Sequence, residues 1–198
     1  MEPHEPHTEA PQRHLAFIGM AGSGKSAISR RIAARIGRPV VDIDAAVVER
    51  TGRSIPDIFG AEGEAYFRRL ETEELDRALH FGAPVVIATG GGVVESAENR
   101  ELLRSLADTV LLDAPEDVLL ERLRNSSHRR PLLESDLEGN VHRLLERRRD
   151  LYRGLADLVV TVGPDAVAAT ASAVFDAVVE RWPDVAAPTS PSGAGAVT

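Results

Sequence analysis

The sequence predicts a single α/β domain in which helices cover both faces of a parallel sheet. Two observations predict this fold. Short β-branched apolar runs alternate with amphipathic segments, and the length of 198 residues suits one domain. With 43 % hydrophobic and 27 % charged residues, the composition is that of an ordinary globular protein, which excludes collagen-like and wholly disordered classes.

Five apolar runs are expected to be the strands of this sheet. They are short, nearly continuous and rich in Val, Ile and Leu, which is typical of strands covered on both faces. The runs are residues 14–18, 39–43, 84–88, 109–112 and 158–162.

The segments between these runs show helical spacing, with apolar residues recurring three or four positions apart. The expected helices contain Ile28, Ile32 and Ile36 before Gly37; Phe67 to Leu79 before Gly82; Val118 to Leu123 after Pro115; and Val174 to Val179 before Pro183. Strands that alternate with helices of this length favour a parallel sheet.

The two ends of the chain are rich in Pro, Ala, Ser, Gly, His and Glu and contain few large apolar residues. Such segments bury too little surface to fold, so we expect disordered tails at 1–13 and 183–198 and one domain at 14–182. No apolar run is long enough to cross a bilayer, and residues 1–13 do not resemble a signal peptide. The expected location is the cytoplasm, with no membrane partner.

Composition also excludes several kinds of chemistry. The sequence contains no Cys, which rules out disulfides, thiolate metal sites and a cysteine nucleophile. A net charge of −8 argues against nucleic acid as a partner, although small anions can still bind where cations gather locally.

A phosphate-binding loop follows the first expected strand. Residues 19–26 read Gly-Met-Ala-Gly-Ser-Gly-Lys-Ser and lead directly into the helix of Ile28, the context that a P-loop requires. Backbone N–H groups and the helix N-terminus would hold the phosphates, Lys25 would reach the outer ones, and the Ser26 hydroxyl would hold Mg²⁺. Lys25 is the single lysine among 23 basic residues. The motif predicts that the chain binds a nucleoside triphosphate.

Asp42 and Asp44 follow the second strand. Alternation along a strand would send both carboxylates to the same side, at the sheet edge where ligands collect. One could hold metal-bound water and the other could accept the proton of an attacking hydroxyl. The alternative is structural: Asp44 could cap a helix that begins at Ala45.

Further along the chain, Gly90, Gly91 and Gly92 follow the third strand and would let a small ligand touch the backbone, unless they form only a flexible turn. Arg68 and Glu71 are three residues apart on an expected helix, either as an exposed ion pair or as a guanidinium aimed at an acceptor carboxylate.

Two basic segments complete the pattern. Residues 125–131, which are polar and end at Pro131, suggest a mobile lid whose arginine folds over the phosphates. Arg147, Arg148 and Arg149 form a charge run, which is usually a solvated helix face but would attract anions if it lined the pocket.

Together these segments resemble the shikimate kinase family over about residues 14–162. The resemblance rests on the P-loop, Asp42-x-Asp44, Phe67-Arg68-x-x-Glu71, Gly90–Gly92, Arg130-Pro131-Leu132-Leu133 and Arg148-x-x-Leu151-Tyr152. It implies a three-layer α/β/α P-loop kinase fold with a five-stranded parallel sheet and a mobile lid at about 125–137. It also implies transfer of the γ-phosphate of ATP to the 3-hydroxyl of shikimate, a step of aromatic amino-acid biosynthesis, with Mg²⁺ as cofactor and a monomeric enzyme.

The resemblance also implies a role for each matched residue. Lys25, Asp44 as base and Arg130 would be catalytic, and Ser26 and Asp42 would hold the metal. The ATP site would consist of Gly22, Ser23, Gly24, Lys25, Ser26, Ala27 and Arg130. The shikimate site would consist of Asp44, Arg68, Gly90, Gly91, Gly92 and Arg148.

The sequence departs from the family pattern at three places. Asp150 stands where a proline is usual, and Arg147 and Arg149 flank Arg148, so the carboxylate-binding arginine is one of these three. Residues 161–165 lack the basic residue that often lies near adenine. Arg122 and Arg124 both fit the position of the arginine near the lid. A gluconate-kinase-like enzyme and a non-catalytic nucleotide-binding module remain the alternative functions.

Overall fold

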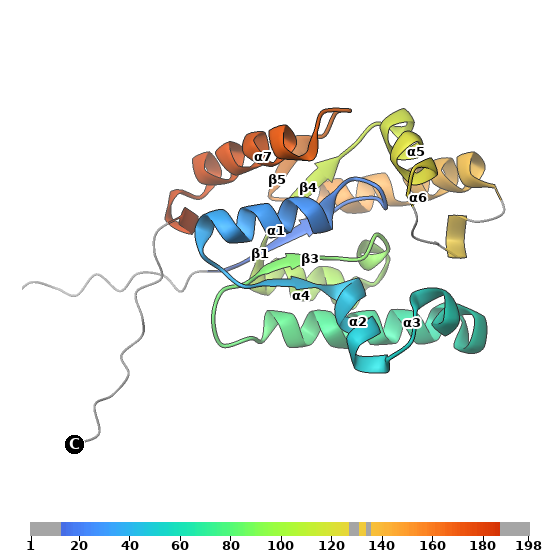
Figure 1. Ribbon diagram of the computed structural model, residues 1–198. Coiled ribbons are helices and arrows are strands. Elements are labelled where there is room, and N and C mark those ends of the chain that lie inside the picture. Colours follow the sequence, from blue (N-terminus) through green and yellow to red (C-terminus); the bar gives the residue numbers. More distant parts are fainter. Residues whose placement is uncertain (1–12, 127–130, 134–135, 187–198) are drawn as a thin grey trace, which may run out of the picture.

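Five parallel strands lie in the order β2-β3-β1-β4-β5 between two helical layers (Figure 1). The computed structural model describes residues 13–126, 131–133 and 136–186. The strands are β1 (His14–Ile18), β2 (Val40–Asp42), β3 (Val86–Ala88), β4 (Ala107–Asp113) and β5 (Leu158–Thr161). This α/β sheet is the one that the alternating pattern predicts.

The register centres the sheet on β1, in which every residue is buried. Phe17 is opposite Ala88 on one side and Val110 on the other, so apolar side chains meet across three strands. The expectation that all strands are covered on both faces is wrong at the edges, where Val40 is 39 % and Val159 is 48 % exposed. Both strands lie at an edge of the sheet and pair with a single neighbouring strand.

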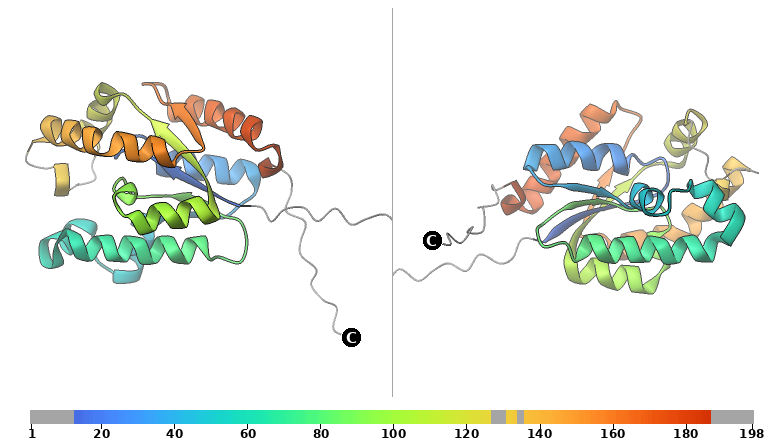
Figure 2. Two further views of the ribbon diagram at one scale, coloured as in Figure 1. Left: turned by 180° about the vertical axis from the view of Figure 1, so that it is seen from behind. Right: turned by 60° about the horizontal axis from the view of Figure 1, so that its bottom comes forward.

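The helices divide between the two faces of the sheet, as the three views show (Figures 1 and 2). One face carries α1 (Lys25–Ile36) and α7 (Val167–Arg181), and the other carries α3 (Ile55–Leu79), α4 (Ala97–Leu106) and α6 (Leu137–Leu155). The remaining helices, α2 (Ile43–Thr51) and α5 (Glu116–Arg124), lie near the carboxyl ends of the strands. Short 3-10 helices are η1 (Val93–Glu95), η2 (Pro131–Leu133) and η3 (Pro183–Ala186).

Local sequence signals account for most helix ends. Gly37 ends α1 in the left-handed conformation with φ 68°, as its position after the Ile stripe predicts. Gly63 bends α3 with φ 81°, and α3 stops at His80 rather than at the expected Gly82. The helices expected from the sequence did not include α4, whose large apolar residues are Leu102, Leu103 and Leu106.

The folded region extends beyond 14–182 at both ends. Arg13 is anchored by its Nε, which lies 3.0 Å from Asp108 Oδ1, and by a hydrogen bond to the carbonyl of Ser105. Past residue 182, η3 places Val185 in the main core with 6 % exposure. One buried valine orders a segment whose overall composition is that of a tail. Within the described ranges, no helix is both long and apolar enough to cross a membrane.

Candidate active site

The P-loop connects the central strand β1 to the first helix, α1, and its glycines are required by the backbone. Gly19, Gly22 and Gly24 all have positive φ angles, of 140°, 88° and 97°. A Cβ on Gly19 would lie 2.7 Å from the carbonyl oxygen of Leu112, and one on Gly22 would lie 3.2 Å from Leu123 Cγ. Larger residues at these positions would therefore change the shape of the loop.

Lys25 is the first residue of α1, and its side chain lies inside the loop. Its Nζ donates hydrogen bonds to the carbonyl oxygens of Gly19 and Met20, both at 2.8 Å. The residue is 8 % exposed. Two backbone carbonyls thus hold the ammonium group at the point where the sheet's central strand ends.

The N-terminus of α1 is open to an anion. Gly24 is the N-cap, and no side-chain hydrogen bond caps the helix. The helix dipole and the free N–H groups of the first turn favour negative charge there. Beside it, the Oγ of Ser23 is buried and has no hydrogen-bond partner within the described part of the chain. Ser26 lies in the first turn and is partly exposed.

The two aspartates after β2 occupy different positions from those that strand alternation predicts. The strand ends at Asp42 and Ile43 begins α2, so the alternation argument does not apply. Asp42 is the N-cap of α2 and accepts from the backbone N–H of Ala45 at 3.3 Å. The alternative in which Asp44 caps this helix is therefore wrong. Asp44 lies in the first turn instead, against the glycine turn: a Cβ on Gly90 would be 3.0 Å from Asp44 Oδ1.

None of Gly90, Gly91 and Gly92 has a positive φ angle, so their backbone conformation does not call for glycine. What matters at these positions is the space that a side chain would fill. A Cβ on Gly90 would overlap Glu71, and a Cβ on Gly92 would overlap the guanidinium of Arg68. The turn is packed on both sides, so the alternative of a loose, flexible connection does not hold.

Arg68 lies between two carboxylates of its own helix, α3. Its Nη1 is 2.8 Å from Glu71 Oε2, and its Nη2 is 3.1 Å from Glu64 Oε1. Glu71 is completely buried, so the pair is not the exposed ion pair that was one reading of the spacing. Burial raises the pKa of the Glu71 carboxyl, although Arg68 acts in the opposite direction.

Arg148 belongs to α6 and contacts the glycine turn on the side opposite Arg68. Its Nη1 donates to the carbonyl of Gly91 at 3.1 Å, and its Nη2 is 2.7 Å from Glu95 Oε2. Tyr152, one turn later, donates its hydroxyl to the same Gly91 carbonyl. Arg148 is 3 % exposed. The structure thus selects it from the arginine run as the residue that is buried against the turn.

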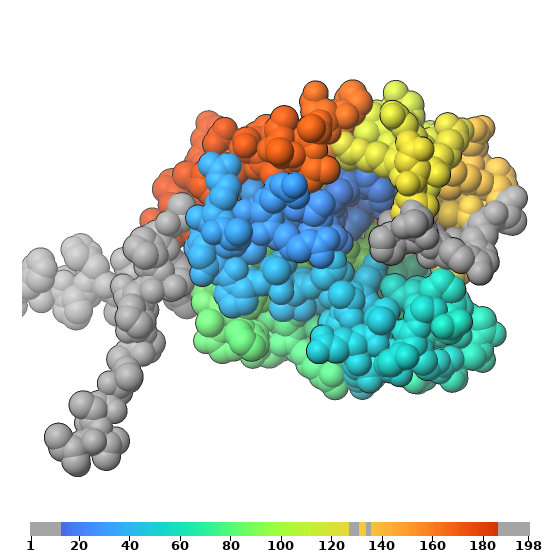
Figure 3. All heavy atoms as spheres, viewed as in Figure 1, coloured from blue at the N-terminus to red at the C-terminus, as the bar shows by residue number. Residues whose placement is uncertain are grey.

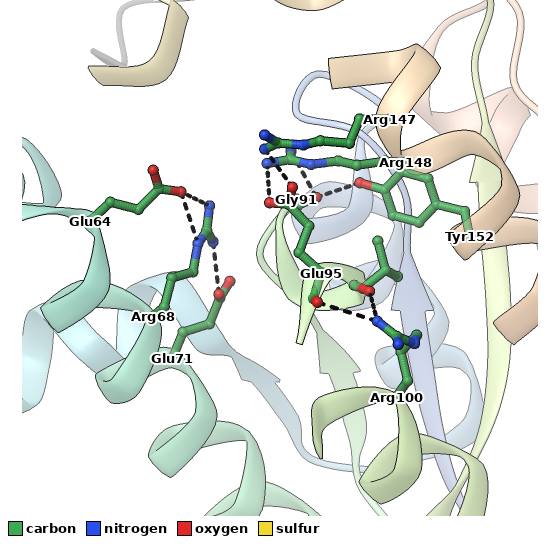
Figure 4. A network of polar contacts seen from close by, with 10 residues as sticks. Glu64, Arg68, Glu71, Gly91, Glu95, Arg100, Arg147, Arg148 and Tyr152 are labelled. Carbon is green, nitrogen blue, oxygen red and sulfur yellow. Dashed lines mark hydrogen bonds and ion pairs between the residues drawn. The ribbon is translucent and has the colours of Figure 1, made fainter. Parts of the chain in front are cut away.

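Its neighbours differ in exposure and contacts. Arg149 is exposed, and Arg147 is exposed but pairs with Glu95. Figure 4 shows the Arg68 cluster from α3 and the Arg148 cluster from α6 on either side of one space. A cavity of about 350 Å³ lies there, with Arg68, Glu71, Glu95 and Arg147 in its lining.

The two arginines that both fit the position near the predicted lid differ in their contacts with the P-loop. Arg122 donates to the carbonyls of Gly22 at 3.4 Å and of Gly163 at 2.7 Å. Arg124 instead pairs with Glu138. Arg122 therefore joins the P-loop to the segment after β5. In the space-filling view, α5 (yellow) and the α2–α3 region (cyan to teal) lie on the same side of the molecule (Figure 3).

Two predicted features fall partly outside the described residues. Arg130 lies in the segment 127–130, which is outside the described residues. The predicted lid at 125–137 shares these gaps, and within it η2 packs Leu133 into the core.

Sequence reasoning did not identify Glu64 or Glu95. Glu64 precedes Arg68 by four residues, and this helical spacing could have revealed it. Glu95 meets Arg148 from 53 positions away, so no local pattern signals the contact.

The fold and the P-loop site define a nucleotide-dependent phosphotransferase of the P-loop kinase class. The family model described as shikimate kinase matches residues 21–180. This chain belongs to the shikimate kinase family, as its motifs predict, and is an ATP-dependent phosphotransferase.

Relatives and solved structures agree with this assignment. A shikimate kinase of Symbiobacterium thermophilum is 46 % identical over 141 residues, which are 70 % of this chain and 80 % of that one. One of Halorhodospira halophila is 44 % identical over 78 % of this chain and 86 % of its own. The solved shikimate kinase from Acinetobacter baumannii in complex with shikimate has a TM-score of 0.79 at 32 % identity, covering 86 % and 94 % of the two chains.

The gluconate-kinase-like alternative finds less support. A gluconokinase from Sinorhizobium meliloti matches with a TM-score of 0.56 and 18 % identity, which is a likeness of fold.

Proposed function

We propose that the chain transfers the γ-phosphoryl group of ATP to the 3-hydroxyl of shikimate, giving ADP and shikimate 3-phosphate. The observation that carries this proposal is the placement of Arg68 and Arg148 on opposite sides of the Gly90–Gly92 turn, next to the P-loop. Two guanidiniums on either side of one glycine turn would suit the carboxylate of a small acid, because arginine binds carboxylates with two parallel hydrogen bonds.

The nucleotide would bind to the P-loop. The uncapped N-terminus of α1 and the backbone N–H groups from Gly22 to Ala27 attract its phosphates. The Lys25 ammonium would leave the carbonyls of Gly19 and Met20 to contact the transferring group, whose charge it would stabilise. Arg122 already lies beside the loop, and Arg130 is proposed to act over the phosphates from the lid.

The acceptor would lie beside the glycine turn, within reach of Asp44. Arg68 and Arg148 would bind its carboxylate, and the backbone of Gly91 would face its ring. In the transfer step, the 3-hydroxyl oxygen bonds to the γ-phosphorus as the bond from that phosphorus to the β,γ-bridging oxygen breaks. The hydroxyl proton passes to the Asp44 carboxylate, and the electron pair leaves with ADP.

Mg²⁺ is proposed as the cofactor, and the residues present suit it. Ser26 and Asp42 offer a hydroxyl and a carboxylate oxygen at the starts of α1 and α2, at the same edge of the sheet. Within the described residues no cluster of three His, Cys, Asp or Glu could form a complete metal cage. This matches Mg²⁺, which keeps several waters and shares phosphate oxygens. When bound, the ion neutralises charge on the phosphates.

We also propose that the enzyme is a monomer, as the resemblance to the shikimate kinase family implies. An ATP-consuming reaction favours a cytoplasmic location.

The test is ADP release by purified protein with ATP and Mg²⁺, with shikimate, gluconate, a nucleoside monophosphate or no acceptor. Shikimate-dependent release that is absent in Lys25→Ala supports the proposal. Release with another acceptor would contradict the roles of Arg68 and Arg148, and binding of nucleotide without any release would indicate the non-catalytic module. In Asp44→Asn, turnover should fall far more than ATP affinity.

A further inference from the structure

One carboxylate, that of Glu95, binds two arginines of α6 at once. Its Oε2 is 2.7 Å from Arg148 Nη2, and its Oε1 pairs with Arg147. The two arginine side chains differ sharply, because that of Arg148 is 3 % exposed and that of Arg147 is 59 % exposed. Figure 4 shows both guanidiniums reaching Glu95. A buried and an exposed cation thus share one counter-ion at the edge of the proposed acceptor pocket.

The buried guanidinium needs this partner when the pocket is empty. An unpaired buried charge is strongly destabilising, and Glu95 supplies the carboxylate in direct contact with Arg148. The other guanidinium of the pocket has a different arrangement. Arg68 pairs with Glu71, which is completely buried, as well as with the more exposed Glu64, so it keeps a buried partner whether or not Glu64 moves. The side chain of Glu95 is 24 % exposed, so it can rotate toward solvent.

The backbone of Glu95 is fixed, which confines any movement to its side chain. Its N–H donates to the carbonyl of Gly92 at 3.0 Å, and its own carbonyl accepts from Arg100 at 3.3 Å. Rotation of the side chain would leave η1 in place and keep the carboxylate near Arg147. The exposed arginine can therefore hold Glu95 after it has released Arg148.

We propose that Glu95 is a resident substitute for the acceptor's carboxylate: it occupies Arg148 in the empty enzyme and passes to Arg147 when the acceptor binds. The inference rests on the proposed function, because it takes the acceptor to be a carboxylate that binds Arg148. The Nη1 of Arg148 donates to the Gly91 carbonyl and its Nη2 contacts Glu95, so an acceptor carboxylate competes with Glu95 for the same guanidinium nitrogen. An acceptor without a carboxylate cannot displace Glu95, so the exchange adds to the selectivity of the site.

Isothermal titration of shikimate, without nucleotide, tests the exchange. Glu95→Gln should bind shikimate about three- to tenfold more tightly than the wild type, because no carboxylate has to be displaced. Arg147→Gln should bind about three- to tenfold more weakly, because Glu95 loses the partner that receives it. ATP affinity should not change in either variant. The matched control is Glu98→Gln, an exposed position nearby on α4, which should bind as the wild type does.

The double variant separates exchange from a general effect of charge. Arg147 acts only through Glu95 in this proposal, so in the Glu95→Gln background Arg147→Gln should have no further effect on shikimate affinity. Additive effects of the two substitutions would overturn the proposal. Weaker binding by Glu95→Gln would overturn it too, since that result would make Glu95 a support that holds Arg148 in position.

Two further controls complete the design. If the wild type itself does not bind shikimate, the proposed function fails; if it binds and Glu95→Gln binds equally, only the exchange fails. Circular dichroism checks each fold. Should Glu95→Gln not fold, Glu95→Asp keeps the charge on a shorter side chain that cannot span both arginines, and tighter shikimate binding is again expected.

Discussion

The hydroxyl of Tyr152 donates a hydrogen bond to the carbonyl oxygen of Gly91, 61 positions earlier in the chain. The same carbonyl accepts from Arg148. One backbone oxygen therefore ties α6 to the middle of the glycine turn and fixes the buried arginine relative to it. Burial raises the pKa of the Tyr152 hydroxyl above its usual value of about 10, so the group is a neutral donor at neutral pH.

Tyr152→Phe should loosen this connection without removing a charge. We expect the free energy of unfolding to fall by about 1 kcal/mol, the typical value for one hydrogen bond. The KM for shikimate should rise severalfold while the KM for ATP stays constant, because the turn and Arg148 belong to the acceptor half of the site. Urea unfolding and steady-state kinetics check both effects. An equal rise of both KM values would show that the bond supports the whole fold.

Gly92→Ala should damage the acceptor site more than it damages stability. A Cβ at this position would overlap the guanidinium of Arg68, which is the far end of a flexible side chain and can move aside. We expect shikimate affinity to fall by about tenfold or more, as for loss of a charge-assisted pair, and ATP affinity to stay unchanged. Calorimetric titration of both ligands measures this. The control is Gly154→Ala on α6, where a Cβ would meet no atom within 4 Å. Unchanged shikimate affinity in Gly92→Ala would show that Arg68 need not lie beside the turn.

The P-loop, the sheet and the family could be predicted from the sequence, because their signals are local. The glycine pattern of residues 19–26 between a strand and a helix is typical of a P-loop. The side chain of Lys25 lies inside this loop, as the pattern predicts. The apolar runs give the strands because the side chains of central strands are buried on both faces. Edge exposure could not be predicted, since nothing in the run containing Val159 says that the strand has a single neighbour.

The contacts between distant segments were beyond local reasoning. The alternative in which Asp44 caps the helix is wrong, because the strand ends one residue earlier than expected and Asp42 is the cap; the metal role of Asp42 stays a proposal. A shift of one residue in the end of the strand decides which of the two aspartates caps the helix. Likewise, Arg122 and Arg124 are two residues apart on one helix, and only the packed fold shows which of them reaches the P-loop.

Lys25→Arg should abolish most turnover although it keeps the positive charge. The Nζ of Lys25 fits between two carbonyls of the loop, 2.8 Å from each, at a position that is 8 % exposed. A planar guanidinium is wider and would push the loop apart or point away from the phosphates. We expect kcat to fall by about 100-fold or more, comparable with loss of a donor to a transition-state charge. Arg31→Lys, on the exposed side of α1, is the control for exchange of the two cations. Near-native kcat in Lys25→Arg would show that charge alone suffices.

His14 gives the fold a defined sensitivity to acid. Its Nδ1 accepts a hydrogen bond from the backbone N–H of Val85 at 3.2 Å, and the residue is 9 % exposed. Burial lowers the pKa of the imidazole below 6.5, with Arg38 acting in the same direction. The unfolded chain therefore binds a proton more readily than the folded one, so the free energy of unfolding should fall as pH drops from 6.5 toward the lowered pKa. Above 6.5 this contribution is fully present, and below the folded pKa the loss is complete.

Urea unfolding of the wild type and of His14→Gln between about pH 8 and about pH 5 isolates the effect, because the other groups cancel in the difference. The stability advantage of the wild type should shrink across this range, and a difference that stays constant with pH would show that His14 keeps an ordinary pKa in the fold.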